Sequence, residues 1–300
     1  MLQPNKIIFD SQYPITDIYF DILDRLWYGT SNGSICCPSL SFTINAHKGP
    51  CLSVKYIDII GCSVSLGGKD GKLIKHSDLS TINLNHHTYC NIEVMSNNSI
   101  WVPGIINSSI YVIDPITWKC IHGPLLWSKR GMIMHISKLN DNSLLMSFEN
   151  GTIILIDQRF LSKTISEVAI LSEPVMYMDA LNENFCLAGN YDEDVLKISI
   201  TPQDQLILSK AIKNSRNCMN LQIRPDNKLF ACSDKNGSVY LRSCHKECKP
   251  LLSKPLNFHR ESLSCIRFSK DSNIMACGGL DCMISLWNLY PPGSRLCISK

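Results

Sequence analysis

The sequence predicts an all-β fold, a seven-bladed β-propeller, and three observations point to it. A unit of short apolar runs separated by polar turns recurs seven times, at intervals of about 37 to 45 residues, which is the length of a four-stranded propeller blade. No stretch shows a helical period over three or four turns. The chain has 300 residues, 45% of them hydrophobic, enough to fill a large core.

The seven units follow one another over nearly the whole chain, which predicts a single domain of residues 1–300. Each unit is anchored by the first apolar residue after its tight turn: Ile35, Leu73, Ile110, Ile153, Val195, Val239 and Ile284. The predicted blades are residues 14–46, 47–86, 87–128, 129–172, 173–213, 214–257 and 258–292, followed by a tail of residues 293–300.

The turns explain the period. Four of them contain an Asn-Gly or Asp-Gly pair, at Asn32, Asp70, Asn150 and Asn236. Such pairs accept positive φ at both central positions of a two-residue hairpin, so we expect type I′ turns there.

The last unit lacks an outer strand. It stops after its third run at Trp287, before Pro291-Pro292, which cannot continue an inner strand. An unused apolar run at residues 6–10 precedes the first unit. We expect this segment to pair with residues 283–288 and close the ring.

The composition argues against several classes of protein. The 29 basic and 26 acidic residues give a net charge of +3, which argues against a polyanion-coating chain. The start of the chain lacks the apolar core of a secretory signal, and no apolar run is long enough to span a membrane. The 15 scattered cysteines are expected to act as small hydrophobes in a reducing compartment, so we expect an intracellular protein.

Unit seven resembles a WD40 repeat over residues 259–268, 276–281 and 284–288. The resemblance implies a structural network of hydrogen bonds among a His, a Ser or Thr, an Asp and a Trp. The matching residues of unit seven are His259, Cys277 in the Ser/Thr place, Asp281 and Trp287, and those of unit two are His47 and Asp70, with His76 where Trp would lie.

Residues 259–292 resemble more narrowly the guanine-nucleotide-binding-protein β-subunit-like and ASTRA-associated protein 1 family. That resemblance implies a non-enzymatic subunit without cofactors, located in the nucleus and cytoplasm. It also implies work with Tel-Tti co-chaperones, RuvB-like ATPases and phosphatidylinositol-3-kinase-related kinases, and a link to chromatin regulation. The alternative is a generic WD scaffold protein of another complex.

Enzyme and metal motifs are weak. Residues 67–72 resemble a phosphate loop but are one residue short, and Leu73 replaces its Ser/Thr. The Cys244-His245-x-x-Cys248 run offers three zinc ligands where a structural site needs four, and His86-His87 with Cys90 fits a connecting loop. We therefore predict no catalytic residue and no metal ligand. A propeller hydrolase of the diphthine methyl-ester type is the enzyme alternative.

The loops before each first strand are basic. They carry Lys48, Lys129, Arg130, Lys213, Arg216 and Arg260 against Glu173 and Glu261. This rim suits an acidic or phosphorylated partner segment, although solvated loop charges explain it equally well. The acidic turn at residues 192–194 interrupts the rim. Direct nucleic-acid binding is not expected, because the tryptophans are spread over different units and Trp101 falls in a core position.

Overall fold

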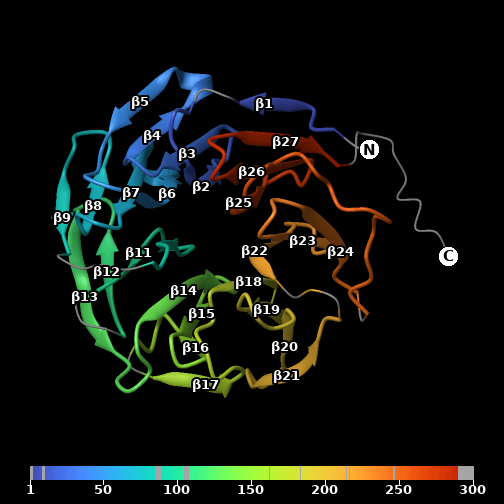
Figure 1. Cartoon of the computed structure of the whole chain (residues 1–300). Helices are drawn as coiled ribbons and strands as arrows, with labels where there is room; N and C mark the ends of the chain where they lie inside the picture. The colour runs from blue at the N-terminus through green and yellow to red at the C-terminus, as the bar shows by residue number, and fades with distance from the viewer. Residues whose placement is uncertain are drawn as a thin grey trace.

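The computed structural model describes residues 3–8, 11–84, 89–104, 108–161, 163–182, 184–213, 215, 217–245 and 247–289. Seven sheets are arranged in a ring around a central channel, as Figure 1 shows. The all-β, seven-bladed fold predicted from the repeat is confirmed. In the described part of the chain, no helix has the length and apolar character needed to cross a membrane.

Each blade is an antiparallel sheet, and in blades 1 to 6 the strands follow chain order from the channel outward. Blades 1 to 3 are formed by β2 (Ile15–Phe20), β3 (Leu26–Thr30), β4 (Ser34–Cys37) and β5 (Phe42–Asn45); β6 (Cys51–Ile57), β7 (Cys62–Gly67), β8 (Lys72–Lys75) and β9 (Thr81–Asn83); and β10 (Glu93–Val94), β11 (Ile100–Pro103), β12 (Ser109–Asp114) and β13 (Lys119–Leu126). Two short 3-10 helices, η1 (Pro38–Leu40) and η2 (Asp58–Ile60), lie in blades 1 and 2.

The remaining blades continue the ring. Blades 4 to 7 are formed by β14 (Ile133–Lys138), β15 (Ser143–Phe148), β16 (Thr152–Asp157) and β17 (Thr164–Ala169); β18 (Tyr177–Asn182), β19 (Phe185–Gly189), β20 (Leu196–Ile200) and β21 (Leu206–Ala211); β22 (Cys218–Ile223), β23 (Leu229–Asp234) and β24 (Val239–Ser243); and β25 (Leu263–Phe268), β26 (Ile274–Gly279), β27 (Ile284–Asn288) and β1 (Lys6–Ile8).

Blade 6 departs from the four-stranded expectation, because its sheet contains three strands. The segment that follows β24 meets it only at isolated bridges, between Val239 and Leu256 and between Arg242 and Pro250. Pro250 and Pro255 lack the N–H group that a regular fourth strand would donate.

The prediction of type I′ turns is wrong. Gly33, Gly151 and Gly237 have φ values of 88°, 81° and 79°, but the asparagines before them do not have positive φ. Each of these glycines donates its N–H to the carbonyl three residues earlier, as Gly33 does to Thr30 over 3.0 Å. This is a type I turn followed by a left-handed glycine, which needs only one positive φ.

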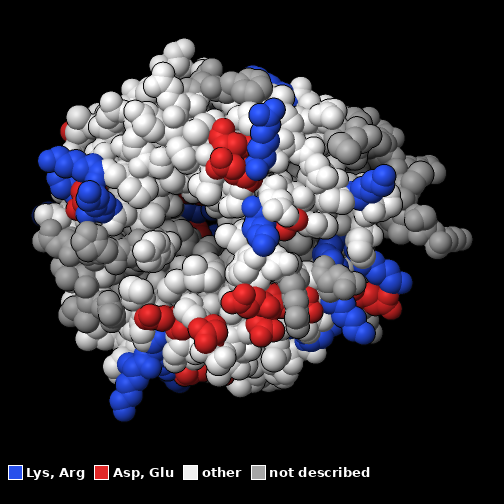
Figure 2. Space-filling view, viewed as in Figure 1, with Lys and Arg blue, Asp and Glu red and all other residues white. Residues whose placement is uncertain are grey.

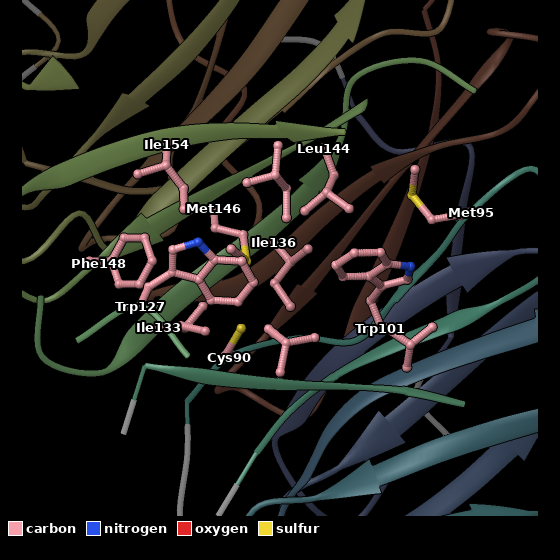
Figure 3. Packing of buried hydrophobic residues seen from close by; sticks show 13 residues of the cluster. Cys90, Met95, Trp101, Trp127, Ile133, Ile136, Leu144, Met146, Phe148 and Ile154 are labelled. Carbon is pink, nitrogen blue, oxygen red and sulfur yellow. The ribbon is translucent and has the colours of Figure 1, made fainter. Parts of the chain in front are cut away.

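The core is divided into clusters that lie between neighbouring blades. In the cluster between blades 3 and 4, Trp101 and Trp127 pack with Ile136, Met146 and Phe148 (Figure 3). The predicted core position of Trp101 is confirmed, since it is 1% exposed. Six other clusters join the other six pairs of consecutive blades in the described chain. Each blade therefore depends on both neighbours for burial of its faces.

Most of the described cysteines are free and buried among these clusters. Burial raises the pKa of Cys186 and of Cys265 to about 12, so these thiols stay protonated at neutral pH. Cys244 and Cys248 pack in the cluster between blades 5 and 6. No group of three or more His, Cys, Asp or Glu suited to a metal occurs among the described residues.

The N-terminal strand closes the ring. β1 pairs antiparallel with β27, with Lys6 opposite Leu286, Ile7 opposite Ser285 and Ile8 opposite Ile284. The Asn5 N–H donates to the carbonyl of Leu286 over 2.8 Å, and the Asn5 Oδ1 accepts from the N–H of Asn288 over 2.6 Å. The closing strand is confirmed for residues 6–8, whereas predicted residues 9–10 lie outside the described residues. The first and last blades are thus joined by main-chain hydrogen bonds between chain segments nearly the whole sequence apart.

We expect Ile8→Ala to lower the free energy of unfolding by about 2 to 3 kcal/mol, because the side chain packs between blades 7 and 1. Urea unfolding followed by tryptophan fluorescence measures the change. Lys6→Ala in the same strand is the control, since Lys6 is exposed. Equal free energies of unfolding for the two variants would show that burial of Ile8 in the closing strand does not stabilise the fold.

Candidate functional site

The loops before the innermost strands and the turns between second and third strands meet at one end of each blade. We call this end the upper face and the opposite end the lower face. The proximity is shown by Asp70 and Asp281, which lie in such turns and accept hydrogen bonds from the backbone N–H groups of Lys48 and Arg260, over 3.1 Å each, in the preceding loops.

A buried network organises the upper end of blade 7. His259 Nδ1 lies 3.0 Å from both carboxylate oxygens of Asp281, and its Nε2 lies 2.8 Å from the hydroxyl of Ser285. Trp287 Nε1–H donates to the same hydroxyl over 2.8 Å. With Nδ1 protonated, the imidazole donates to Asp281 and accepts from Ser285, so every polar group is satisfied.

The hydroxyl of this network comes from a strand that the sequence pattern did not indicate. Cys277 has no hydroxyl and lies directly opposite Ser285 on the adjacent strand. Ser285 therefore supplies the hydroxyl from β27 in place of a Ser or Thr on β26. The signal in the sequence was the spacing of Ser285 and Trp287, because residues two apart in a strand share one face.

Blade 2 builds the equivalent network with a different donor. His47 Nδ1 lies 3.2 Å from the Asp70 carboxylate, and its Nε2 lies 2.7 Å from the hydroxyl of Ser65. His76 Nε2 lies 2.9 Å from this hydroxyl. His76 thus replaces the indole N–H of a tryptophan with an imidazole N–H. Ser65 is a further residue that the sequence pattern did not single out.

Burial keeps the two histidines of blade 2 neutral. It lowers the pKa of His47 despite the nearby Asp70 carboxylate, and together with His47 it lowers the pKa of His76 to about 4. The hydroxyls of Ser65 and Ser285 are fully buried. The networks therefore hold loops and turns together and present no nucleophile to a substrate.

Only some residues of the predicted basic rim are exposed to solvent. Lys48, Lys129, Lys213 and Arg260 are exposed on upper-face loops. Arg130 is half-buried, forms an ion pair of 2.6 Å with Glu167 and lies over the Phe148 ring. Arg216 lies outside the described residues.

A group of acidic residues lies on blades 4 and 5. Figure 2 shows a group of acidic side chains over the region of β14 to β19, with basic side chains mainly over other blades. Glu149, Glu173, Asp192 and Glu193 are exposed on the upper loops and turns of blades 4 and 5. The upper ends of blades 4 and 5 thus carry a cluster of exposed carboxylates.

A second polar feature lies along the central channel. Each innermost strand has a polar or charged residue at the blade spacing, and we call these seven the channel ring: Asp17, Lys55, Glu93, His135, Asp179, Gln222 and Arg267. They recur at the blade spacing, so this period was readable in the sequence. They were not predicted, because a single charged residue inside an otherwise apolar strand does not stand out in the sequence.

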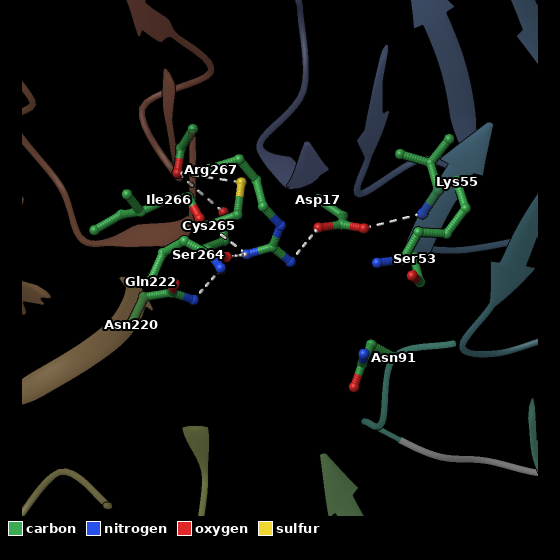
Figure 4. Close-up of polar contacts among 12 residues, drawn as sticks. Asp17, Ser53, Lys55, Asn91, Asn220, Gln222, Ser264, Cys265, Ile266 and Arg267 are labelled. Carbon is green, nitrogen blue, oxygen red and sulfur yellow. Dashed lines mark hydrogen bonds and ion pairs between the residues drawn. The ribbon is translucent and has the colours of Figure 1, made fainter. Parts of the chain in front are cut away.

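Direct contacts connect several residues of the channel ring, and Figure 4 shows Arg267 beside Asp17 and Gln222. Arg267 donates to Asp17 over 2.9 Å and to Gln222 Oε1 over 3.2 Å. Gln222 Nε2–H and the N–H of Ile223 each donate to Asp179 over 2.6 Å. On the other side, Lys55 Nζ lies 3.8 Å from Glu93.

Asp179 makes stability depend on pH. Burial raises its pKa to about 7, against about 3.9 in an unfolded chain, so this group favours the folded state at low pH and that contribution is lost as the pH rises from about 4 to 7. Asp179→Asn keeps an acceptor for Gln222 and Ile223. We expect the variant to gain about 2 kcal/mol relative to wild type between about pH 5 and 8.

Urea unfolding at the two pH values measures this difference. Asp204→Asn, which changes an exposed carboxyl, is the control. A stability difference between Asp179→Asn and wild type that does not vary with pH would show that Asp179 titrates normally.

For the blade 7 network, we expect Ser285→Ala to lower the free energy of unfolding by about 2 to 3 kcal/mol, because it leaves two buried groups of His259 and Trp287 unpaired. Cys277→Ala is the matched change on the opposite strand and keeps both hydrogen bonds. Thermal unfolding compares the two. A greater loss for Cys277→Ala would contradict the assigned role of Ser285.

Comparisons with known proteins agree with this geometry. A family model described as WD domain, G-beta repeat matches residues 249–288. The guanine nucleotide-binding protein subunit beta-like protein 1 of Mus musculus is 25% identical over 296 residues, which cover 89% of this chain and 88% of that protein. ASTRA-associated protein 1 of Schizosaccharomyces pombe is 26% identical over 151 residues, 48% of this chain and 40% of that protein.

Transcription factor unc-37 of Caenorhabditis elegans is 27% identical over 161 residues, which cover 50% of this chain and 25% of that protein. The matched repeat contains His259, Asp281 and Trp287, the residues of the blade 7 network. The chain therefore contains a WD repeat within a seven-bladed β-propeller, and it is similar at low identity to guanine nucleotide-binding protein subunit beta-like protein 1 and to ASTRA-associated protein 1.

Proposed function

We propose that this propeller, a single domain divided into the seven predicted units, is a non-enzymatic scaffold that binds other proteins through its upper face. The observation that carries the proposal is the upper face itself, where buried networks hold loops and turns in place and exposed charged side chains surround them. A rigid surface loses little conformational entropy when a partner binds, which favours recognition.

The partners are proposed from the relatives. Similarity to ASTRA-associated protein 1 supports membership of an ASTRA-like complex. The proposed partners in that complex are Tel-Tti co-chaperones, RuvB-like ATPases and phosphatidylinositol-3-kinase-related kinases. Nuclear and cytoplasmic location and a part in chromatin regulation belong to the same proposal.

The exposed basic residues define the segment that the face would accept. Lys48, Lys129, Lys213 and Arg260 suit an acidic or phosphorylated partner segment, and we place Arg216 with them on the sequence argument. Arg130 contributes less, because Glu167 already neutralises it. The acidic residues of blades 4 and 5 repel such a segment and thereby set its orientation.

The proposal is tested by affinity purification of the tagged chain from its own cells, followed by quantitative mass spectrometry. We expect Tel-Tti and RuvB-like proteins, and a large kinase, to be recovered. We expect Lys48→Glu, Lys129→Glu and Arg260→Glu, combined, to reduce their recovery about tenfold, since charges at an interface rim govern encounter and orientation.

The matched control combines Lys119→Glu, Lys163→Glu and Lys228→Glu. It makes the same change of charge at exposed positions of the lower face. Normal recovery with the upper-face variant, in a protein with an unchanged melting temperature, would reject the basic rim as the binding surface. Absence of the named proteins from the wild-type purification would reject the complex.

A further inference from the structure

Blade 6 contains a cavity that the proposed function does not use. Its volume is about 130 Å³, and residues of the loop before β22 and of all three strands line it, among them Cys218, Cys232 and Arg242. The exposed residues Asn217 and Tyr240 lie at its border. The cavity is therefore at the upper end of the blade, and it has room for a molecule of a few atoms.

Strand register explains why this space is open. Cys232 lies opposite Tyr240 in blade 6. Cys277 lies opposite Ser285 at the same register position of blade 7. In blade 7 the imidazole of His259 contacts that serine and is buried at the upper end of the blade. The loop before β22 has no histidine in its sequence, so blade 6 has a cavity where blade 7 has a buried ring.

Two cysteine thiols meet in this cavity. A register shift in β22 lies between Cys218 and Asn220, and it turns Cys218 toward the same face of the sheet as Cys232 on β23. The two thiols hydrogen-bond each other. The carbonyls of Asn220 and Tyr240 lie 3.2 and 3.8 Å from the two sulfurs and accept their S–H groups when both are protonated. Both cysteines are free in the structure.

The surroundings distinguish the two thiols. The Cys218 S–H and the Arg242 guanidinium lower the pKa of Cys232. Burial and the Asp234 carboxylate oppose this shift without reversing it. Burial raises the pKa of Cys218 well above its usual range, and it also raises the pKa of Cys277 at the matching position of blade 7. Cys232 is thus the thiol of the pair that ionises first, and Cys218 stays protonated beside it.

We propose that Cys218 and Cys232 form a redox-active dithiol, which a small hydroperoxide entering the cavity oxidises to a disulfide. In the first step the Cys232 thiolate attacks one peroxide oxygen. An S–O bond forms, the O–O bond breaks, and the departing oxygen takes the proton that Cys232 released, leaving as water or an alcohol. In the second step the Cys218 sulfur attacks the sulfenic acid, the S–O bond breaks, and water leaves with the thiol proton. The two thiols lose two electrons and the peroxide gains them.

The first experiment oxidises the reduced, folded wild-type protein with hydrogen peroxide. The remaining thiols are then blocked with iodoacetamide in denaturant, and the products are identified by mass spectrometry after trypsin digestion. Trypsin cuts after Lys228, so the two cysteines fall in separate peptides of residues 217–228 and 229–235. We expect these peptides to be joined, with the loss of two hydrogens, at least about tenfold faster than Cys277 is modified. Dithiothreitol should separate them again.

Two other cysteines are internal controls. Cys120 is exposed and reports that the peroxide has reacted, whereas Cys277 is buried and reports that the fold has stayed intact. Oxidation of Cys120 without joining of the two peptides overturns the proposal. Joining of Cys232 to another cysteine, or modification of Cys277 at the same rate as the pair, also overturns it.

Variants then assign the two steps. Cys218→Ser removes the second thiol, so peroxide should leave Cys232 as a sulfenic acid that dimedone labels. In Cys232→Ser we expect Cys218 to stay unlabelled, because its thiol remains protonated. Equal labelling of the two variants, or none in Cys218→Ser, would overturn Cys232 as the attacking thiol. If either variant fails to fold, the joined peptides and their rate of formation in wild type still decide. The test does not involve the upper-face rim or the proposed complex.

Discussion

The fold depends on closure of the ring. Each apolar cluster lies between two blades, so a blade that lost one neighbour would expose one face of its sheet. The pairing of β1 with β27 meets this constraint by joining the two ends of the chain within one sheet. Because main-chain hydrogen bonds and the burial of Ile8 act together there, the closing strand is short and still effective.

The upper face shows how one structural role can be filled by different atoms. A histidine links an aspartate to a serine hydroxyl in both blade 2 and blade 7, and a ring N–H donates to that hydroxyl in each. The hydroxyl lies on the second strand in blade 2 and on the third strand in blade 7. What matters is the position of the oxygen in space, since two paired strands can present it to the same point.

A nearly neutral chain has produced two regions of uneven charge. On the upper face, exposed acidic residues gather on blades 4 and 5, whereas Lys48, Lys213 and Arg260 lie on other blades. In the channel, charged residues from five innermost strands come within range of one another in partly buried surroundings, where each charge is felt more strongly than at the surface. The raised pKa of Asp179 follows from this burial.

Repeat length, the Gly-containing turns and the spare apolar run at residues 6–10 determined the number of blades and the means of closure, because a repeated local pattern reports directly on a repeated local structure. Sequence also identified His259, Asp281 and Trp287 as members of one network. It missed Ser285, Ser65 and the channel ring, and it did not show that Arg130 is neutralised by Glu167. These depend on which residues of different strands or blades lie opposite one another, and strand register and the closing of the ring decide that only in the folded chain.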